Sequence, residues 1–341
     1  MPRIAIDAMG GDFAPSVVVR GTYKSAKDHP DWVLILVGDE VAVRRELEPC
    51  GPALQNIAVV HAPESIGMDE HPVEALKSKR NASLPVAVGL VHAGKADAVM
   101  SAGNTGALVA ASTMLLRHLP GVRRAGICTT LPSLTGGVAV MDVGANVQAK
   151  ASHLVHYGVM GQIFFESVMA KPGQKVHVGL LSVGGEEGKG NQLVRETHAM
   201  LQRAPVSFLG NVEGHEVFEG RAEVVITDGL VGNIVLKTAE GLSEILLKLF
   251  GKHAKSTGLA ATPLFEPTIR SLAQEIDWRE VGGAALLGVN GVVVIAHGRS
   301  DDVAIGSAIR IAAGCCNSNM NQKIVAALKQ TEATAEAAPG A

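Results

Sequence analysis

The stretch from Asp97 to Leu116 constrains the fold more than any other part of the sequence. Its first residues, 98–101, predict a short buried strand, and the apolar run that begins near Thr105 predicts a helix. Between the two, Gly103 and Gly106 allow positive φ and close backbone approach, and Ser101, Asn104 and Thr105 are residue types that cap helices. Such a turn is either an anion cradle built from free amides or an ordinary capped turn.

Composition and element order favour an α/β protein. Apolar residues make up 47% and aromatic residues 3% of the 341 residues, with 39 glycines, which suits Ala, Val and Leu packing joined by tight turns. Strands expected at 3–7, 32–37 and 57–60 alternate with helices expected at 15–28 and 41–48. This alternation predicts a mostly parallel, doubly wound sheet. We expect one catalytic domain over 1–330 and a disordered tail over 331–341.

Charge and cysteine usage restrict the function classes. The formal net charge is −3, so the chain has no global basic field for nucleic acid. Its four cysteines form no Cys-x-x-Cys pair, which fits a reducing cytoplasm. The sequence shows no signal peptide, and the glycine and polar residues within 98–116 argue against a membrane-spanning helix. His153 and His156 are spaced for one helix face, but no acidic partner is near in sequence, so we expect no metal site.

Small and polar residues follow several other expected strands, at the strand ends where open parallel sheets bind ligands. Asp7, Gly10 and Gly11 follow the first strand; Asp142 and Asn146 follow a strand at 138–141. The glycine-rich segment 182–191 carries Lys189, whose charge suits phosphate oxygens. A Gly-x-Gly-x-x-Gly fingerprint is missing at the first turn, which argues against a nicotinamide dehydrogenase.

A second turn repeats the first. Asp228 and Gly232 lie between a strand expected at 224–226 and a helix, on which Asn233 and Lys237 share one face. His297 closes a late buried strand. Two such turns strengthen the expectation of an anion site between them. Residues 245–275 are apolar and basic by turns, and predict a helical hairpin that contacts a membrane surface or apolar ligand, or packs in a dimer.

Together these motifs closely resemble the PlsX family, the bacterial phosphate acyltransferases of phospholipid synthesis. The resemblance runs through Asp7-Ala-Met-Gly-Gly-Asp12, Ser101-Ala-Gly-Asn-Thr-Gly106, Asp142-Val-Gly-Ala-Asn146, the segment 228–241 and the segment 286–298, and covers about residues 3–320. It implies a three-layer α/β/α fold like that of isocitrate/isopropylmalate dehydrogenases and phosphotransacetylase, without a cofactor. It also implies acyl transfer from acyl-[acyl-carrier-protein] to inorganic phosphate.

The same resemblance implies a cytoplasmic homodimer, loosely associated with the inner face of the membrane, with a membrane glycerol-3-phosphate acyltransferase as a further partner. The alternatives are phosphotransacetylase-like acyl transfer with coenzyme A, and a non-catalytic partner of lipid enzymes.

We hypothesise that amides of the 101–106 turn bind phosphate with Asn104, Thr105 and Lys189. Asn233 would polarise the thioester carbonyl, and Lys237 or His297 would assist the leaving sulfur. The floor of the binding site would be shaped by Asp7, Asp142 and Asn146. The remaining predicted substrate-binding residues lie in the strand-end turns: Gly10, Gly11, Ser101, Gly103, Gly106, Asp228 and Gly232.

Overall fold

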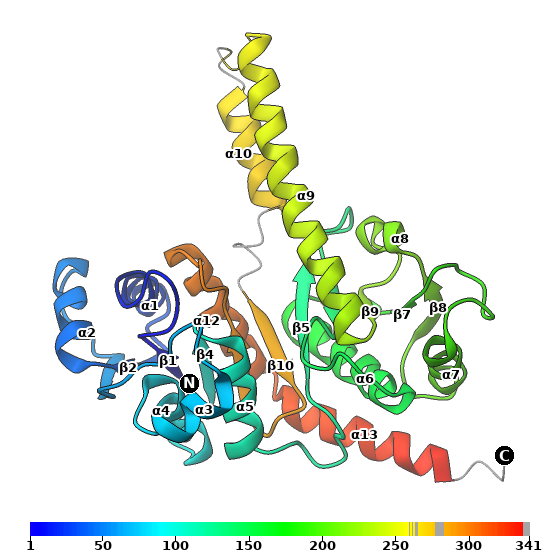
Figure 1. The fold of residues 1–341 in the computed structure, drawn as a ribbon, viewed down its shortest axis with the longest axis horizontal. Coiled ribbons are helices and arrows are strands. Elements are labelled where there is room, and N and C mark those ends of the chain that lie inside the picture. Colours follow the sequence, from blue (N-terminus) through cyan, green and yellow to red (C-terminus); the bar gives the residue numbers. More distant parts are fainter. Residues whose placement is uncertain (259, 261, 263–264, 277–282, 337–341) are drawn as a thin grey trace.

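A computed structural model describes residues 1–258, 260, 262, 265–276 and 283–336. Its centre is one sheet of eleven strands in the order β3-β2-β1-β4-β11-β10-β5-β6-β9-β7-β8 (Figure 1). The strands are β1 (Arg3–Asp7), β2 (Val33–Gly38), β3 (Ile57–His61), β4 (Ala98–Ser101), β5 (Gly126–Leu131), β6 (Val138–Met141), β7 (Val178–Leu181), β8 (Phe208–Val212), β9 (Val224–Ile226), β10 (Ala284–Leu287) and β11 (Val292–Ile295).

Most strand pairs are parallel, and the antiparallel ones lie together in the middle of the sheet. β10 pairs antiparallel with β11 and with β5, and β5 pairs antiparallel with β6. The parallel group β6, β9, β7 and β8 therefore runs opposite to the group β1–β4 and β11. As a result, the carboxyl ends of the two parallel groups lie at opposite edges of the sheet.

Helices cover both faces, because alternate residues of the strands point to opposite sides. Ile4 and Ile6 face one apolar cluster, and Ala5 faces the other. The first cluster is covered by α1 (Ser16–Asp28), α2 (Glu40–Leu47), α6 (Ala151–Val168), α7 (Gln192–Leu201), α12 (Asp302–Asn317) and α13 (Met320–Glu336). The second is covered by α3 (Pro72–Ser78), α4 (Ser83–His92), α5 (Thr105–Leu115), α8 (Gly214–Glu219) and α9 (Gly229–Ser256). This confirms the predicted three-layer fold.

The predicted helical hairpin is formed by α9 and α10 (Phe265–Ile276), which extend away from the body of the molecule (Figure 1). The rings of Phe250 and Phe265 stack with their centroids 6.1 Å apart and link the two helices. A 3-10 helix, η1 (Glu48–Cys50), completes the described elements.

Most elements lie within one residue of the expected bounds, and two elements differ by more. A strand is also expected at 206–209, but β8 begins at Phe208, because the preceding segment turns where the Val206 amide donates to the Ala204 carbonyl. α13 continues to Glu336, so residues 331–336 of the expected disordered tail are helical, and 337–341 lie outside the described residues. The continuous sheet supports a single domain over 1–330, which stays a prediction.

Candidate active site

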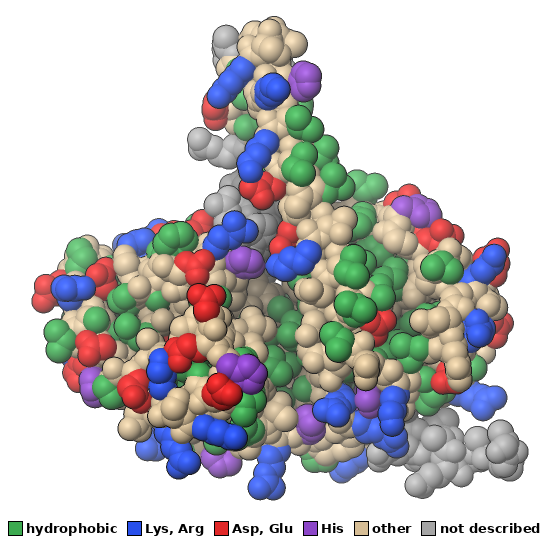
Figure 2. Space-filling model, viewed as in Figure 1, with side chains coloured by type: hydrophobic (Ala, Val, Ile, Leu, Met, Phe, Trp, Pro, Cys, Tyr) green, Lys and Arg blue, Asp and Glu red, His purple; other side chains and the backbone are tan. Residues whose placement is uncertain are grey.

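A cavity of about 200 Å³ lies between the N-terminus of α5, the end of β11, the middle of β5 and one side of α9. It brings together four predicted residues from distant parts of the chain: Thr105, Asn233, Lys237 and His297. The cavity is also lined by Ile127, Thr129, Thr130, Leu131, Val143, Leu236, Glu240, Gly283, Ala284, Ile295, Ala296, Ser300 and Ala304. Basic, acidic and histidine side chains gather on the surface at the base of the hairpin (Figure 2).

Hydrogen bonds connect the turn after β1 to the turn after β4. The Ser101 hydroxyl donates to Oδ2 of Asp7 at 2.6 Å, and the Gly103 amide donates to Oγ of Ser101 at 3.0 Å. A Cβ on Gly10 would lie 2.5 Å from that same Asp7 oxygen and 2.8 Å from the Gly103 nitrogen, so only glycine fits. Burial raises the pKa of Asp7, against the opposing effect of its hydrogen bonds. These predicted substrate-binding residues therefore hold the turns after β1 and β4 together.

Gly11 allows the loop after β1 to reach the loop after β11. Its φ of +110° is a conformation that glycine adopts without strain. The following amide, of Asp12, donates to the Gly298 carbonyl at 2.8 Å. The loop after β1 is thereby fixed to the loop that carries His297.

Asn104 has its whole side chain engaged in structure. Its Oδ1 caps α5 by accepting from the Ala107 amide at 3.0 Å. Its Nδ2 donates to the carbonyls of Gly67, Met68 and Glu70 at 3.0–3.3 Å. Asn104 therefore positions the 67–70 segment beside the helix entrance and has no donor left for a ligand.

The amides that follow it are available. Among the described residues, no hydrogen-bond acceptor is found for the amides of Thr105 or Gly106, at the positive end of the α5 dipole. A Cβ on Gly106 would lie 2.7 Å from Cγ of Pro72, so the α3 proline packs against this turn. Of the two residues, Thr105 lines the cavity.

The entrance of α9 is built differently. Its cap, Asp228, accepts from the amides of Leu230 and Val231 at 3.0 and 3.1 Å. A Cβ on Gly232 would lie only 1.9 Å from the Asp142 carbonyl oxygen, so Gly232 serves close packing. Asp228 and Gly232 thus hold α9 against the loop after β6, while the second turn of the helix supplies Asn233 to the cavity.

Asp142 and Asn146 form the base of that loop. The buried Asp142 carboxylate accepts from the amides of Ile127, Gly144, Ala145 and Asn146 at 2.7–3.1 Å. The Asn146 side chain donates to the Ala125 carbonyl at 2.6 Å and to the Tyr157 hydroxyl at 2.9 Å. Both side chains are occupied by hydrogen bonds within the protein. Val143 is the residue of this loop that lines the cavity.

His297 lines the cavity from the loop after β11, and its surroundings favour the neutral imidazole. Burial lowers the pKa of His297, and the Lys237 cation lowers it further. Lys237 Nζ itself pairs with Oε2 of Glu240 at 2.8 Å, three residues along α9. The cavity therefore contains a partly neutralised cation beside a neutral histidine.

Ser300 is a site residue that the sequence analysis missed. It is buried and lines the cavity, yet its hydroxyl has no hydrogen-bond partner among the described residues. A buried hydroxyl without a partner is costly, which makes it a candidate ligand contact. Nothing in its sequence context distinguishes it from other serines. Glu240 was also missed, although its i, i+3 spacing from Lys237 indicates the ion pair.

Lys189 lies outside the lining of this cavity. It is an exposed residue of the loop after β7, and its amide donates to the Glu186 carbonyl at 3.0 Å. Its side chain packs over Gly184, where an added Cβ would lie 3.0 Å from Cγ of Lys189.

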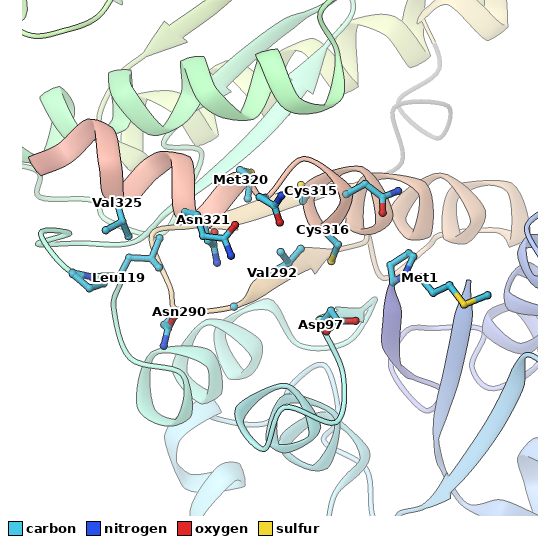
Figure 3. Close-up of a pocket in the computed structure, with 16 residues that line it drawn as sticks. Met1, Asp97, Leu119, Asn290, Val292, Cys315, Cys316, Met320, Asn321 and Val325 are labelled. Carbon is cyan, nitrogen blue, oxygen red and sulfur yellow. The ribbon is translucent and has the colours of Figure 1, made fainter. Parts of the chain in front are cut away.

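A larger cavity, of about 660 Å³, is lined by Met1, Asp97, Asn290, Cys315, Cys316 and Asn321 among others (Figure 3). It lies at the amino ends of β1, β4 and β11, whereas open sheets bind ligands at carboxyl ends. None of the predicted site residues lines it. Within the described ranges, no group of three His, Cys, Asp or Glu residues is placed to hold a metal ion. No described helix is long and apolar enough to span a membrane.

Solved structures with the same architecture define the class of fold. The phosphotransacetylase of Streptococcus pyogenes superposes with a TM-score of 0.62 at 18% identity, covering 93% of this chain and 94% of that one. A 4-hydroxythreonine-4-phosphate dehydrogenase from Klebsiella pneumoniae gives a TM-score of 0.55 at 14% identity, covering 93% and 100%. The chain has the isocitrate/isopropylmalate dehydrogenase-like fold that these proteins share.

Sequence similarity identifies the family. Residues 2–323 match the model of the family described as "Fatty acid synthesis protein". The phosphate acyltransferase of Desulfitobacterium hafniense (strain Y51) is 43% identical over 98% of this chain and 100% of its own length. That of Thermodesulfovibrio yellowstonii is 42% identical over 97% and 96%. The chain belongs to this family of phosphate acyltransferases, which is the PlsX family, and it is an acyltransferase enzyme.

Proposed function

We propose that the enzyme transfers the acyl group of an acyl-[acyl-carrier-protein] thioester to inorganic phosphate, giving acyl phosphate and free carrier protein for phospholipid synthesis. The observation that carries this proposal is the shared cavity. One small space is lined by Thr105 at the start of α5, by Asn233 and Lys237 of α9, by His297, and by Ser300, whose hydroxyl has no partner in the described part of the chain.

Phosphate is assigned to the α5 end of the cavity. The amide of Thr105 lies at the positive end of the α5 dipole, an arrangement that favours an anion. The Ser300 hydroxyl supplies a further donor, and the Lys237 cation adds charge attraction. Phosphate oxygens would satisfy the buried hydroxyl, for which the described residues offer no partner.

The thioester carbonyl is assigned to Asn233. An oxygen of hydrogen phosphate attacks the carbonyl carbon, and the Asn233 amide N–H stabilises the oxyanion that forms. When the carbon–sulfur bond breaks, the sulfur leaves with the bonding electrons and takes the proton that the hydrogen phosphate carried. His297 donates a hydrogen bond from Nε2 either to a phosphate oxygen or to the leaving sulfur.

The chemistry needs no protein nucleophile. Phosphate is already an anion near neutral pH, and a thiol with a pKa of about 8.5 is a good leaving group. What the enzyme contributes is orientation of the two reactants and stabilisation of developing charge.

The test is direct product analysis with the full chain. Acyl-carrier-protein thioester and phosphate should yield acyl phosphate and free thiol in equal amounts, with no product when phosphate is left out. Acyl-coenzyme A is the comparison donor. A clear preference for the coenzyme A thioester would favour phosphotransacetylase-like transfer, and hydrolysis to free fatty acid alone would overturn the proposal.

Lys189 is proposed to act on the carrier-protein donor. Its exposed position in the loop after β7, outside the cavity lining, favours contact with a docked protein over contact with phosphate. Lys189→Met should raise KM for the acyl-carrier-protein severalfold and leave KM for phosphate unchanged.

We propose further that the enzyme is a homodimer associated peripherally with the inner face of the membrane, where a glycerol-3-phosphate acyltransferase uses the acyl phosphate. Exposed apolar residues on the α9 hairpin support an interaction role; Ile245, Leu249 and Phe250 are 55%, 46% and 43% exposed. Light scattering tests the dimer, and flotation with phospholipid vesicles tests the membrane association.

A further inference from the structure

The segment between β3 and α3 crosses the surface of the molecule beside the candidate active site. We use "strap" for residues 64–71, which are all described by the structure and belong to no helix or strand. The first of them is fixed to α4, because the Ser83 amide donates to the Glu64 carbonyl at 2.9 Å. The last leads into Pro72, the first residue of α3, and α3 packs beside α5 (Figure 1). Both ends of the strap are therefore anchored to helices.

The strap connects two neighbours of the cavity lining. A Cβ added to Gly298 would lie 2.9 Å from Cε of Met68, so this methyl group packs directly on the residue after His297. At the other end, Cγ of Pro72 packs against Gly106 in the first turn of α5. The strap thus reaches from the loop that carries His297 to the entrance of α5, although none of its residues lines the cavity.

Lys79, which follows α3, connects the two halves of the strap. Its Nζ donates to Oε1 of Glu70 at 2.6 Å and to the Ser65 carbonyl at 3.0 Å. The same Glu70 oxygen accepts from the Gly67 amide at 2.6 Å. The hydrogen bond from Lys79 is the main cause that holds the pKa of Glu70 below its usual value, so the two side chains form an ion pair at neutral pH.

Polar contacts do more than apolar packing to fix the path of the strap. Ile66 is its buried large apolar side chain, whereas Met68 is 43% exposed. Lys79 and the Asn104 side chain, which donates to three strap carbonyls, supply the remaining contacts. Because partly exposed ion pairs add little to global stability, loss of the Lys79 contacts should change the position of the strap more than the folding of the chain.

We propose that the strap keeps water out of the phosphate end of the active site, and that Lys79 is the positioning residue that holds it closed. This inference rests on the proposed function, because it takes phosphate to lie at the α5 entrance. Acyl phosphate is itself open to hydrolysis. The oxygen of water adds to the carbonyl carbon, phosphate leaves with the bonding electrons and takes up a proton of the water, and fatty acid results. A closed strap leaves phosphate as the nucleophile that reaches the carbonyl.

The partition between products gives the proposal its specific test. In Lys79→Met, the initial ratio of free fatty acid to acyl phosphate should rise about tenfold or more over that of the unaltered enzyme. KM for phosphate should rise severalfold, and KM for the acyl-carrier-protein should not change. Because unfolded enzyme forms neither product, the product ratio does not depend on the folded fraction.

Two further lysine variants accompany this measurement. Lys79→Arg keeps the cation and its donors and should restore most of the original product ratio. Lys95→Met, at an exposed position after α4, is the matched control and should leave the ratio unchanged.

Met68 provides an independent pair of variants. Met68→Ala removes the methyl group that packs on Gly298 and should raise the product ratio, whereas Met68→Leu keeps an apolar contact there and should raise it less. Met114→Ala, at an exposed methionine on α5, is the control. If Met68 and Lys79 act through one strap, the double variant should show less than the two single effects combined.

The outcomes separate the two levels of inference. If the unaltered enzyme forms no acyl phosphate, the proposed function itself fails. If it does, but Lys79→Met and Met68→Ala keep the original product ratio, the strap proposal is overturned and the proposed function stands. The strap proposal is equally overturned if Lys79→Met raises only KM for the acyl-carrier-protein, which would make Lys79 a contact for the carrier protein.

Discussion

The backbone amide of Arg299 donates to Nδ1 of His297 at 3.1 Å. Because Nδ1 accepts this hydrogen bond, the proton of the neutral ring is on Nε2. Burial and the Lys237 cation lower the pKa of this histidine, so the neutral form persists at neutral pH.

This relationship predicts an acid limb in the pH profile of kcat. Protonation of His297 would break the bond at Nδ1, so activity should fall as the pH drops below the lowered pKa and stay level above it. In His297→Gln, which keeps a donor near the Nε2 position, kcat should fall about tenfold or more and the acid limb should disappear. A profile unchanged in the variant would show that another group titrates.

Ser300 gives a prediction about phosphate affinity. Removing a donor to a charged ligand costs about 1.5–3 kcal/mol, so Ser300→Ala should raise KM for phosphate by about tenfold or more. Ser112→Ala is the matched control, because Ser112 is also buried, its hydroxyl on α5 has no partner among the residues described, and it does not line the cavity. Equal phosphate KM values in the two variants would remove Ser300 from the site.

Asn104 should prove to be a structural residue. Asn104→Ala loses the helix cap and the donor that holds three carbonyls, and we expect it to lower the free energy of unfolding by about 1–3 kcal/mol. Chemical denaturation measures this. A variant with unchanged stability and a raised KM for phosphate would instead place the phosphate on the Asn104 side chain.

His156 predicts a pH dependence of stability. It is buried in α6, its Nδ1 has no partner among the described residues, and burial lowers its pKa to about 4. The unfolded chain takes up this proton near pH 6.5 and the folded chain near pH 4, so stability is full above pH 6.5 and falls between these values. The loss should be about 1–3 kcal/mol, and His156→Phe should remove it. His215→Phe, at an exposed position, should not.

The sequence predicted the local elements of the site better than their arrangement. The pattern around Asn104 indicates a capped strand-to-helix turn, and the spacing of Asn233 and Lys237 places them on one helix face, because both depend on neighbouring residues. The reversal of strand direction at β10 and β5 depends on pairing between distant segments, which local periodicity does not contain. For the same reason the sequence predicted that Asp142 shapes the floor of the ligand site. In the structure its carboxylate accepts hydrogen bonds from backbone amides instead.

Asn233 tests the central claim most directly, that one amide in the cavity stabilises the oxyanion of phosphate attack. Removal of such a donor typically costs about 3 kcal/mol, so Asn233→Ala should lower kcat for acyl phosphate formation on the order of 100-fold. The same variant should keep the stability of the unaltered enzyme, and Ile234→Ala, its exposed neighbour on α9, should keep kcat within about twofold. An Asn233→Ala enzyme that is fully folded and turns over at the original rate would contradict the account.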